Sequence, residues 1–369
     1  MQDKKRCIAL CALFCLFIAG GLVWNLLTPD RVFSPMENRN LAQKPAFSLQ
    51  ALFSGEYTAD METYLTDQFA GRDWWVGLKY YSERALLKTE NNGIYFAGGD
   101  RLIERFDEPV EGRPENNLAA VSALAEATGL PVDFSLIPTA AYIYADSLPK
   151  NAPGYDQQGL LELAAQTLPQ QYFDLSQVLM ENRDLPAFYR TDHHWTSDGA
   201  FAAYEVIARR LGFEAFPKPE GKTVVTGFFG TLYSQAGARG YESEDIVYYD
   251  ASGLSLWVDG EEKPFYDLSY VDQKDKYSLF LGGNYPVCII RNEQNPDGEK
   301  LLLIKDSFSN SLVPFLARHF SEIHMIDPRY YMLPMSEYTS QNAIDRVLVL
   351  YQTKNFVQDS AIVLVAKWA

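Results

Sequence analysis

The stretch YRTDHHWTSDGA, from Tyr189 to Ala200, brings together the residue types that acid–base chemistry requires. Two of the chain's four histidines, His193 and His194, directly follow Asp192. A carboxylate that binds one imidazole nitrogen fixes the tautomer of the ring and leaves the other nitrogen free to act as a base. In an extended loop, residues i and i+2 point to one side and residue i+1 points to the other. We therefore expect Asp192 to bind His194, and His193 to point away from both.

A second stretch, LLLIKDSFSNSLVPFL, places Ser307 between a buried strand and a helix. The backbone N–H groups at the start of that helix can hold an oxyanion. A serine nucleophile needs a base within hydrogen-bond reach and a third group that orients the base. Ser307, His194 and Asp192 are therefore the candidate triad. A structural alternative exists for each part, because serine often caps a helix and an Asp-x-His pair in a loop is often structural.

Metal binding is the weaker interpretation of these histidines. Adjacent histidines diverge in an extended chain, and the other two, His319 and His324, lie far away in the sequence. We expect no metal and no cofactor, and we interpret His319 and His324 as structural. Trp195 is expected to pack beneath the histidine loop.

Strand-like and helix-like segments alternate around both stretches, which predicts an α/β fold with a mostly parallel sheet and helices on both faces. Ligands bind such sheets where strands lead into helices, and the two stretches occupy such places. From 213 to about 299, short Val, Tyr and Phe runs between turn residues predict a β-rich insertion. The predicted strands are Val132–Pro138, Gln171–Leu175, Lys300–Lys305, Glu322–Asp327 and Arg346–Tyr351, and the predicted helices are Asn117–Leu130, Tyr155–Leu168, Asp198–Leu211 and Asn310–Phe320.

The amino-terminal residues 1–30 predict a cytoplasmic tip and a transmembrane signal-anchor. Three basic residues precede an uncharged, mostly apolar run from Cys7 to Leu27, which is long enough to span a bilayer. The rest of the chain would then be extracytoplasmic at the cell membrane, with a cleaved signal peptide and a secreted form as the alternative. Residues 31–116 read as a helical, aromatic-rich segment that ends in the polar linker Asp107–Asn116, and 117–369 as the catalytic domain.

Composition narrows the function classes further. The net charge of −16 argues against nucleic-acid binding, which needs a basic face, while a hydrophobic content of 47% supplies a sizeable core. Three of the four cysteines lie in the apolar run. The remaining one, Cys288, stands in the run VCII, which is typical of a buried small hydrophobe rather than a nucleophile.

The chain resembles the DHHW family of bacterial exported proteins through YRTDHHWTSDGAFAAY and the later IKDSFSNSLVPFL. The stretches YLTDQFAGRDWW, LIPTAAYIYADSLP, GFFGTLYSQAG and DKYSLFLGGN support the likeness, which covers nearly the whole exported chain. That family is similar to the alginate O-acetylation proteins and, more distantly, to the SGNH hydrolases. The resemblance implies an SGNH-hydrolase-like (flavodoxin-like) fold and assigns the triad to Asp192, His194 and Ser307.

The same resemblance implies acetyl transfer to exported polysaccharide, with a membrane-bound O-acyltransferase as the acetyl source. It offers Gly283 and Asn284 as oxyanion donors, although an ordinary turn explains them equally well. Arg329 and Tyr330, after the strand EIHMID, are candidates for substrate contact. One departure from the relatives is that no carbohydrate-binding domain is recognisable after the catalytic one.

Three functions therefore remain open at the level of sequence. The first is an O-acetyltransferase, or the serine-bearing partner of one. The second is a carbohydrate acetylesterase with the same triad, and the third is a non-catalytic scaffold for envelope or spore assembly. The polysaccharide, the acyl donor and the oligomeric state are not encoded in any pattern that we recognise.

Overall fold

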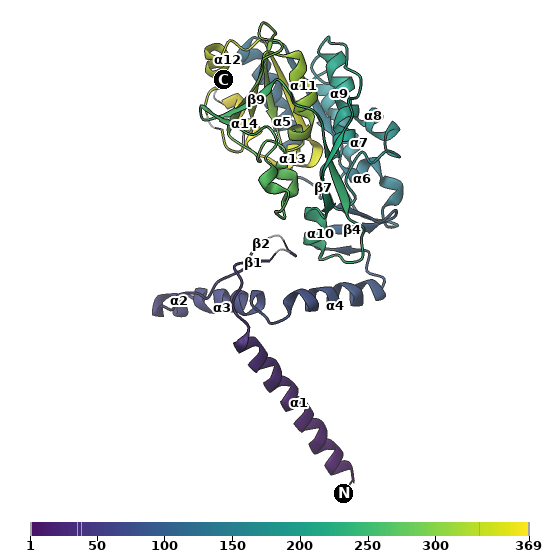
Figure 1. Cartoon of the computed structure of the whole chain (residues 1–369), viewed down its shortest axis with the longest axis vertical. Coiled ribbons are helices and arrows are strands. Elements are labelled where there is room, and N and C mark those ends of the chain that lie inside the picture. The colour runs from purple at the N-terminus through teal and green to yellow at the C-terminus, as the bar shows by residue number, and fades with distance from the viewer. Residues whose placement is uncertain (1, 35, 38, 332, 368–369) are drawn as a thin grey trace. The chain divides into compact units, whose positions relative to one another are not determined.

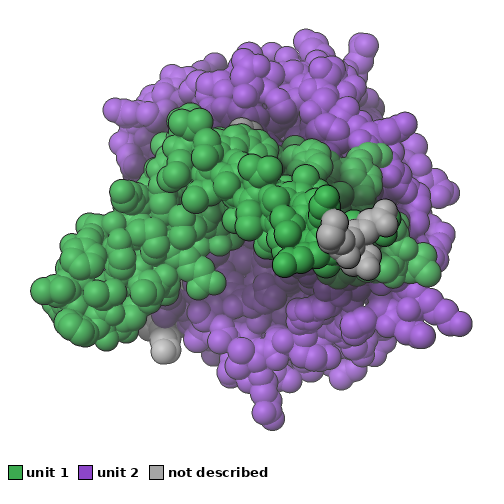
Figure 2. All heavy atoms as spheres, turned by 90° about the horizontal axis from the view of Figure 1, so that it is seen from below, with its two compact units in different colours: residues 1–88, 237–240 green, residues 89–236, 241–369 purple. Residues whose placement is uncertain are grey.

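The computed structural model describes residues 2–34, 36–37, 39–331 and 333–367 (Figure 1). Met1, at the expected cytoplasmic tip, lies outside the described residues. The chain divides into two compact units, residues 1–88 with 237–240 and residues 89–236 with 241–369 (Figure 2). The expected linker, Asp107–Asn116, lies inside the second unit, where it leads into helix α5 (Arg113–Thr128).

The first unit begins with one long apolar helix, α1 (Gln2–Leu27), whose part from Lys4 to Leu27 is long and apolar enough to cross a membrane. It fits a single-pass membrane anchor or a signal sequence. Two further helices lie on either side of Gly71. The unit's remaining elements are α2 (Leu49–Ser54), α3 (Glu56–Asp67), α4 (Arg72–Ala85), β1 (Phe33–Ser34) and β2 (Arg39–Asn40).

The second unit is built on a seven-stranded mixed sheet, which confirms the predicted α/β class. The sheet order is β10-β9-β11-β13-β12-β14-β6. The pairs β13–β12, β12–β14 and β14–β6 are parallel, and the pairs β10–β9, β9–β11 and β11–β13 are antiparallel. The strands are β6 (Val132–Ile137), β9 (Leu254–Val258), β10 (Glu261–Lys263), β11 (Val287–Asn292), β12 (Lys300–Lys305), β13 (Glu322–Ile326) and β14 (Arg346–Gln352).

Helices cover both faces of this sheet because its central strands are apolar on both sides. Leu301 and Leu303 of β12 pack with α9 (Ser197–Arg210) and α11 (Ser309–Leu316). Leu302 and Ile304 pack on the opposite face. The successive side chains of a strand point to opposite faces, so the run LLLI serves both cores. The helices of the second core are α5, α7 (Gln157–Thr167), α12 (Met335–Gln341), α13 (Thr353–Gln358) and α14 (Ile362–Lys367).

The β-rich insertion is present, and it extends the sheet instead of standing apart. Its strands β9, β10 and β11 provide the three antiparallel pairings, so only the half of the sheet from β13 to β6 is parallel. Its other strands, β7 (Lys222–Phe228) and β8 (Glu244–Tyr248), pair with each other, and the short helix α10 (Thr231–Ala236) lies between them in the chain. A three-stranded sheet precedes the main one, with β3 (Glu90–Asn91), β4 (Ile94–Ala97) and β5 (Arg101–Glu104).

One predicted strand is wrong. The segment Gln171–Leu175 makes a single bridge, from Tyr172 to Phe134 of β6, and no ladder follows. Helix α7 ends at Thr167 and α8 (Ser176–Glu181) begins soon afterwards, so too little chain remains for a strand to run along β6.

Candidate active site

Ser307, His194 and Asp192 form a continuous hydrogen-bonded chain. Ser307 lies in the turn between β12 and α11, and its Oγ is 2.8 Å from Nε2 of His194. The other ring nitrogen, Nδ1, is 2.7 Å from Oδ1 of Asp192. Ser307 is half-buried whereas His194 and Asp192 are buried, so only the hydroxyl end of the chain is open to a ligand. These contacts fix the histidine tautomer and leave Nε2 facing the serine.

Asp192 is held as a carboxylate by its surroundings. Its Oδ1 accepts a hydrogen bond from the backbone N–H of His194 at 3.0 Å, and its Oδ2 accepts two from Thr231, from N–H at 2.8 Å and from Oγ1 at 3.0 Å. Burial would raise the pKa of Asp192, but the positive field of His193 and His194 and these hydrogen bonds outweigh burial and hold the pKa well below its usual range. Asp192 therefore stays charged at any physiological pH.

His193 does not point away from the site, and that expectation is wrong. Its Nδ1 lies 2.9 Å from Oγ1 of Thr231, and its ring centroid is 3.9 Å from that of His194. The loop from Thr191 to His194 is bent, so the alternation of an extended chain does not apply to it. Burial and the neighbouring His194 lower the pKa of His193, although Asp192 acts in the opposite direction. His193 thus contacts the same threonine hydroxyl that donates to Asp192.

Aromatic side chains hold the imidazole of His194 in place. The ring of Tyr277 stacks on His194, with the centroids 3.8 Å apart and the planes within 9°. Phe308, beside the candidate nucleophile, lies 5.0 Å from the same ring. Tyr277 comes from the β-rich insertion, as does Thr231, and no spacing in the sequence linked either one to the site. Two stretches that carried the family resemblance, DKYSLF and GTLYS, contain them and were the only signal.

Backbone contacts position the histidine loop from behind. The carboxylate of Glu244, in β8, accepts hydrogen bonds from the N–H groups of Arg190 and Thr191 and from the Thr191 hydroxyl. Arg101, in β5, is buried and donates through Nη1 to the carbonyl oxygens of Phe188 and Tyr189. Neither residue was singled out from the sequence. Each satisfies loop groups that would otherwise be buried without partners.

Trp195 connects the histidine loop, residues 191–194, to the serine turn, residues 306–308, and to the helix that follows it. Its side chain is fully buried, and its Nε1 donates to the carbonyl oxygen of Phe308 at 2.9 Å and to Oγ of Ser311 at 3.0 Å. The ring also lies edge-on to Phe308. The expected packing role is confirmed, and the indole N–H adds a direct bond between the two stretches.

The Gly283–Asn284 turn is attached to the residues that flank Ser307. Lys305, buried at the end of β12, donates through Nζ to Oδ1 of Asn284 at 2.7 Å and to Oδ1 of Asn310 at 2.8 Å. Asn310 donates through Nδ2 to the carbonyl oxygen of Gly283 at 3.2 Å. The N–H of Gly283 points to the carbonyl oxygen of Phe280 at 3.4 Å, which weakens its case as an oxyanion donor. Lys305 binds the side-chain oxygen of Asn284, and Nδ2 of Asn284 makes no hydrogen bond to any described residue.

Arg329 and Tyr330 follow β13, but their side chains are differently engaged. Arg329 makes two hydrogen bonds to the buried Asp327, from Nε at 2.8 Å and from Nη2 at 2.6 Å. Those bonds and the Asp327 charge hold the pKa of Arg329 above its usual range despite burial. Tyr330 is 58% exposed. No bond joins either one to Ser307, His194 or Asp192 within the described ranges, so their role stays a prediction.

Side-chain atoms of Asp192, His193 and His194 that can bind a metal lie within 4.8 Å of one another, close enough to share one ion. Both ring nitrogens of His194 are already occupied, by Asp192 and by Ser307. A metal would have to displace one of these contacts, so the donor set fits proton transfer better than coordination. His319 and His324 lie elsewhere, bonded to Tyr204 and to Tyr338.

Comparison with known proteins places the fold. The model of a family described as DHHW protein matches residues 131–326. A DHHW family protein from Eubacterium siraeum superimposes with a TM-score of 0.61 at 22% identity, covering 74% of this chain and 95% of that one. PatB1 of Bacillus cereus superimposes at 0.60 with a sulfonyl adduct and at 0.59 without it, at 20% and 21% identity, covering 73% and 72% of this chain and 97% of PatB1. A comparison with curated proteins gave no significant match.

Proposed function

The chain belongs to the DHHW protein family, and from that premise we propose that it is an extracytoplasmic, serine-dependent O-acetyltransferase. The observation that carries the proposal is the hydrogen-bonded chain from Ser307 through His194 to an ionised Asp192. This is the arrangement that activates a serine hydroxyl for attack on an acyl carbon. The acceptor we propose is a hydroxyl group of cell-surface or exported polysaccharide.

In the first half-reaction, Ser307 Oγ attacks the acetyl carbonyl carbon and its proton passes to Nε2 of His194. Asp192 stabilises the resulting imidazolium through Nδ1. The carbonyl electron pair moves to oxygen, and the tetrahedral intermediate collapses as the bond to the donor's leaving group breaks. That leaving group takes the proton from His194, which leaves acetyl-Ser307 and a neutral imidazole.

In the second half-reaction, His194 removes the proton from a sugar hydroxyl as the hydroxyl oxygen attacks acetyl-Ser307. The ester bond to Ser307 breaks and its Oγ regains the proton from His194. Water in place of the sugar would give an acetylesterase by the same steps.

Two donors are available to hold the oxyanion of both intermediates. The backbone N–H of Ser307 has no hydrogen-bond partner among the residues that the structure describes. Asn284 is exposed and its carboxamide is oriented through the oxygen by Lys305, and its amide N–H groups make no hydrogen bond to any described residue. Preorganised donors of this kind contribute about 3–4 kcal/mol each to transition-state binding.

The apolar helix α1 supports the proposal that the reaction takes place at the membrane. With α1 as an anchor, the chain stays attached to the membrane in which a membrane-bound O-acyltransferase would present acetyl groups. We propose such a protein as the acetyl source. The sulfonyl adduct carried by PatB1 supports reactive nucleophile chemistry in a protein of this fold, because sulfonyl reagents capture activated hydroxyl groups.

The test is hydrolysis of a nitrophenyl acetate by the purified full chain. Ser307→Ala and His194→Ala should each lower kcat/KM by about a thousandfold or more, since triad members act as a unit. Ser309→Ala is the matched control, because its Oγ is buried without a hydrogen-bond partner and its loss should leave turnover unchanged. A sulfonyl fluoride should add its mass to the wild type and to Ser309→Ala but not to Ser307→Ala.

An oligosaccharide added to the acetylated enzyme then distinguishes transfer from hydrolysis. Gain of acetyl mass on the sugar supports the acetyltransferase, and release of free acetate alone supports the esterase. Wild-type turnover in Ser307→Ala would remove the enzyme proposal and leave the scaffold.

A further inference from the structure

The first unit exposes an unusual amount of apolar side chain. Its helices and their flanks carry large apolar residues that are between 37% and 87% exposed, and we call these residues the apolar platform. Large exposed apolar patches mark interaction sites on protein surfaces. The platform consists of Leu52, Phe53, Leu65, Phe69, Trp74, Trp75, Leu78, Tyr81, Leu86 and Leu87.

The platform follows the helical repeat. On α4, Trp74, Leu78 and Tyr81 are spaced i, i+4 and i+7, which places them along one face. Leu65 in the last turn of α3 and Phe69 in the turn that follows it are also exposed. A helix with one apolar, aromatic face that stays exposed has the pattern of an interfacial helix.

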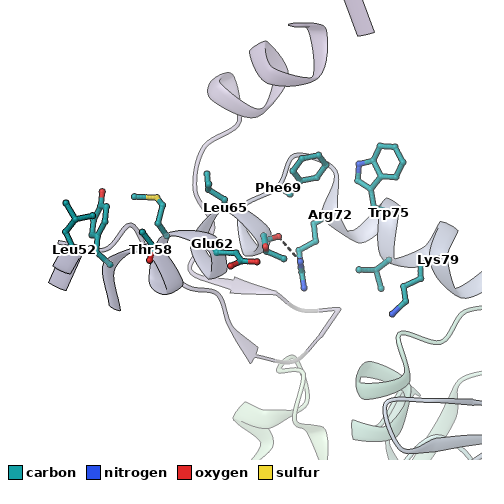
Figure 3. Close-up of a pocket in the computed structure, with 12 residues that line it drawn as sticks. Leu52, Thr58, Glu62, Leu65, Phe69, Arg72, Trp75 and Lys79 are labelled. Carbon is teal, nitrogen blue, oxygen red and sulfur yellow. Dashed lines mark hydrogen bonds between the residues drawn. The ribbon is translucent and has the colours of Figure 1, made fainter. Parts of the chain in front are cut away.

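A groove of about 720 Å³ is lined in part by four residues of the platform, Leu52, Leu65, Phe69 and Trp75 (Figure 3). Leu65, Phe69 and Trp75 extend to the side on which α1 runs. Glu62 and Lys79 extend to the opposite side, as does the guanidinium of Arg72. The apolar side chains therefore face the direction in which the apolar helix continues.

Direct bonds fix α1 to the turn between α3 and α4. The side chain of Asn25, in the last turn of α1, accepts a hydrogen bond from the N–H of Ala70 at 2.8 Å. The indole of Trp24 covers Gly71 so closely that a Cβ there would lie 2.8 Å from it. Removal of α1 as a signal peptide would remove both contacts, so they favour a retained anchor.

From these contacts we infer that the apolar platform lies in the outer interface of the membrane that α1 spans. The 24 residues from Lys4 to Leu27 measure about 36 Å as a helix, against a hydrocarbon core of about 30 Å, so the last turn reaches the headgroup region. Ala70 and Gly71 are held at that turn and must share its depth. The adjoining Trp74 and Trp75 then stand where aromatic belts form.

The occupant of the groove is therefore lipid, and charge plays a small part in the binding. The unit's arginines near the turn are neutralised internally, Arg31 by Asp73 and Arg72 by Glu37, at 2.9 and 2.7 Å. Paired charges offer little attraction to anionic headgroups. Apolar area and indole rings drive the contact, as they do for interfacial helices in zwitterionic bilayers.

Tryptophan quenching by brominated phosphatidylcholine tests the depth of the platform. The full chain is reconstituted into vesicles whose lipids carry bromine near the headgroup end of the acyl chain. A variant with Trp74→Phe and Trp75→Phe should lose more than about half of the quenchable emission and keep the part from Trp24. Trp257→Phe, within β9 of the second unit, is the matched control and should leave the quenching of Trp74 and Trp75 unchanged.

Equal quenched emission in the wild type and the Trp74→Phe, Trp75→Phe variant would overturn the inference. A photocrosslinking residue placed at Leu78 tests the occupant in cells. Adducts to lipid support the inference, whereas a discrete heavier protein band would show that the platform docks a protein instead.

Discussion

Asp192 accepts four hydrogen bonds, which is more than orientation of one imidazole requires. Two come from His194 and two from Thr231, whose hydroxyl also meets His193. Because the carboxylate is buried, each donor lowers the cost of keeping it charged. The hydroxyl of Thr231 is thus the link through which His193 can affect the chemistry without touching the reacting atoms.

The Thr231 link predicts a measurable coupling. Thr231→Val removes the hydroxyl with little change of shape and should lower kcat about tenfold while KM changes little. His193→Ala should lower it by a similar or smaller factor. Because both changes break the same bond, the double variant should fall short of the product of the two, with a coupling of about 0.5–2 kcal/mol. Independent effects would show that His193 only packs against His194.

Asn284 and Lys305 predict a different kinetic signature. Asn284→Ala should lower kcat and kcat/KM together by about 100-fold, as expected for a donor used only in the transition state. Lys305→Met, which releases the carboxamide oxygen, should reproduce part of that loss. Labelling of Ser307 by a sulfonyl fluoride should remain faster in both variants than in His194→Ala. A loss confined to KM would instead assign Asn284 to substrate binding.

The Asp-x-His spacing led to Asp192 and His194, and the position between a buried strand and a helix led to Ser307. The structure places the three within hydrogen-bond distance. Thr231 and Tyr277 could not be found in this way. They reach the site because of the path taken by the β-rich insertion, which no periodicity specifies. The direction of His193 was missed because a bent loop lacks the two-residue repeat on which the expectation relied.

The histidine loop and the serine turn behave as one element held from several sides. Trp195 bonds to the serine turn, Glu244 caps the loop, and Gly230 passes directly against Asp192. A Cβ built at Gly230 would lie 2.2 Å from Cβ and 2.6 Å from Cα of Asp192. Only glycine fits at this position because a side chain would have no space. The backbone conformation of Gly230 itself is one that other residues adopt.

Gly230→Ala should therefore displace the carboxylate. We expect a loss of activity of about 100-fold or more and a loss of stability of about 1–3 kcal/mol, typical of overpacking. Thermal unfolding and nitrophenyl acetate turnover measure the two effects. Gly154→Ala is the control, since its nearest contact would be an ordinary 4.0 Å, and it should change neither quantity. Full activity in Gly230→Ala would show that the loop yields easily.

Apolar runs predicted the parallel strands well, because KLLLIK, EIHMID and RVLVLY are buried on both faces. The antiparallel strands β9 to β11 were recognised as β-rich but not as part of the same sheet. Their partners are chosen by cross-strand packing, such as Ile290 opposite Leu256, and not by local pattern. The sequence therefore predicted the class of the fold but not the order of the strands in the sheet.

At the scale of the whole molecule, His319 predicts how stability depends on pH. The phenol of Tyr204 lies 2.9 Å from its Nε2, and Phe213 and Phe216 stack on the ring. Burial lowers the pKa of His319 to about 4. Between about pH 6.5 and 4 the unfolded chain binds a proton that the folded one does not, so stability falls as the pH falls.

That loss should reach about 3 kcal/mol at pH 4 for this one residue. Denaturant unfolding of the wild type and of His319→Gln across this pH range isolates it. The variant keeps a polar group beside Tyr204 but no longer titrates, so its unfolding free energy should decline less steeply. Parallel curves would contradict the assignment.

The order of strands in the sheet also determines how late in synthesis the candidate site can fold. Strand β6, which is synthesised early, forms its ladder with β14, where Val132 lies opposite Val347, and makes a single further bridge to Tyr172. Ser307 follows β12, which needs β13 and β14 as neighbours. While the chain emerges from the ribosome, Asp192 and His194 must therefore wait for partners that are synthesised last. The parallel sheet therefore forms late, and a nascent chain stalled before residue 346 contains Asp192, His194 and Ser307 but lacks β14, the strand between β12 and β6.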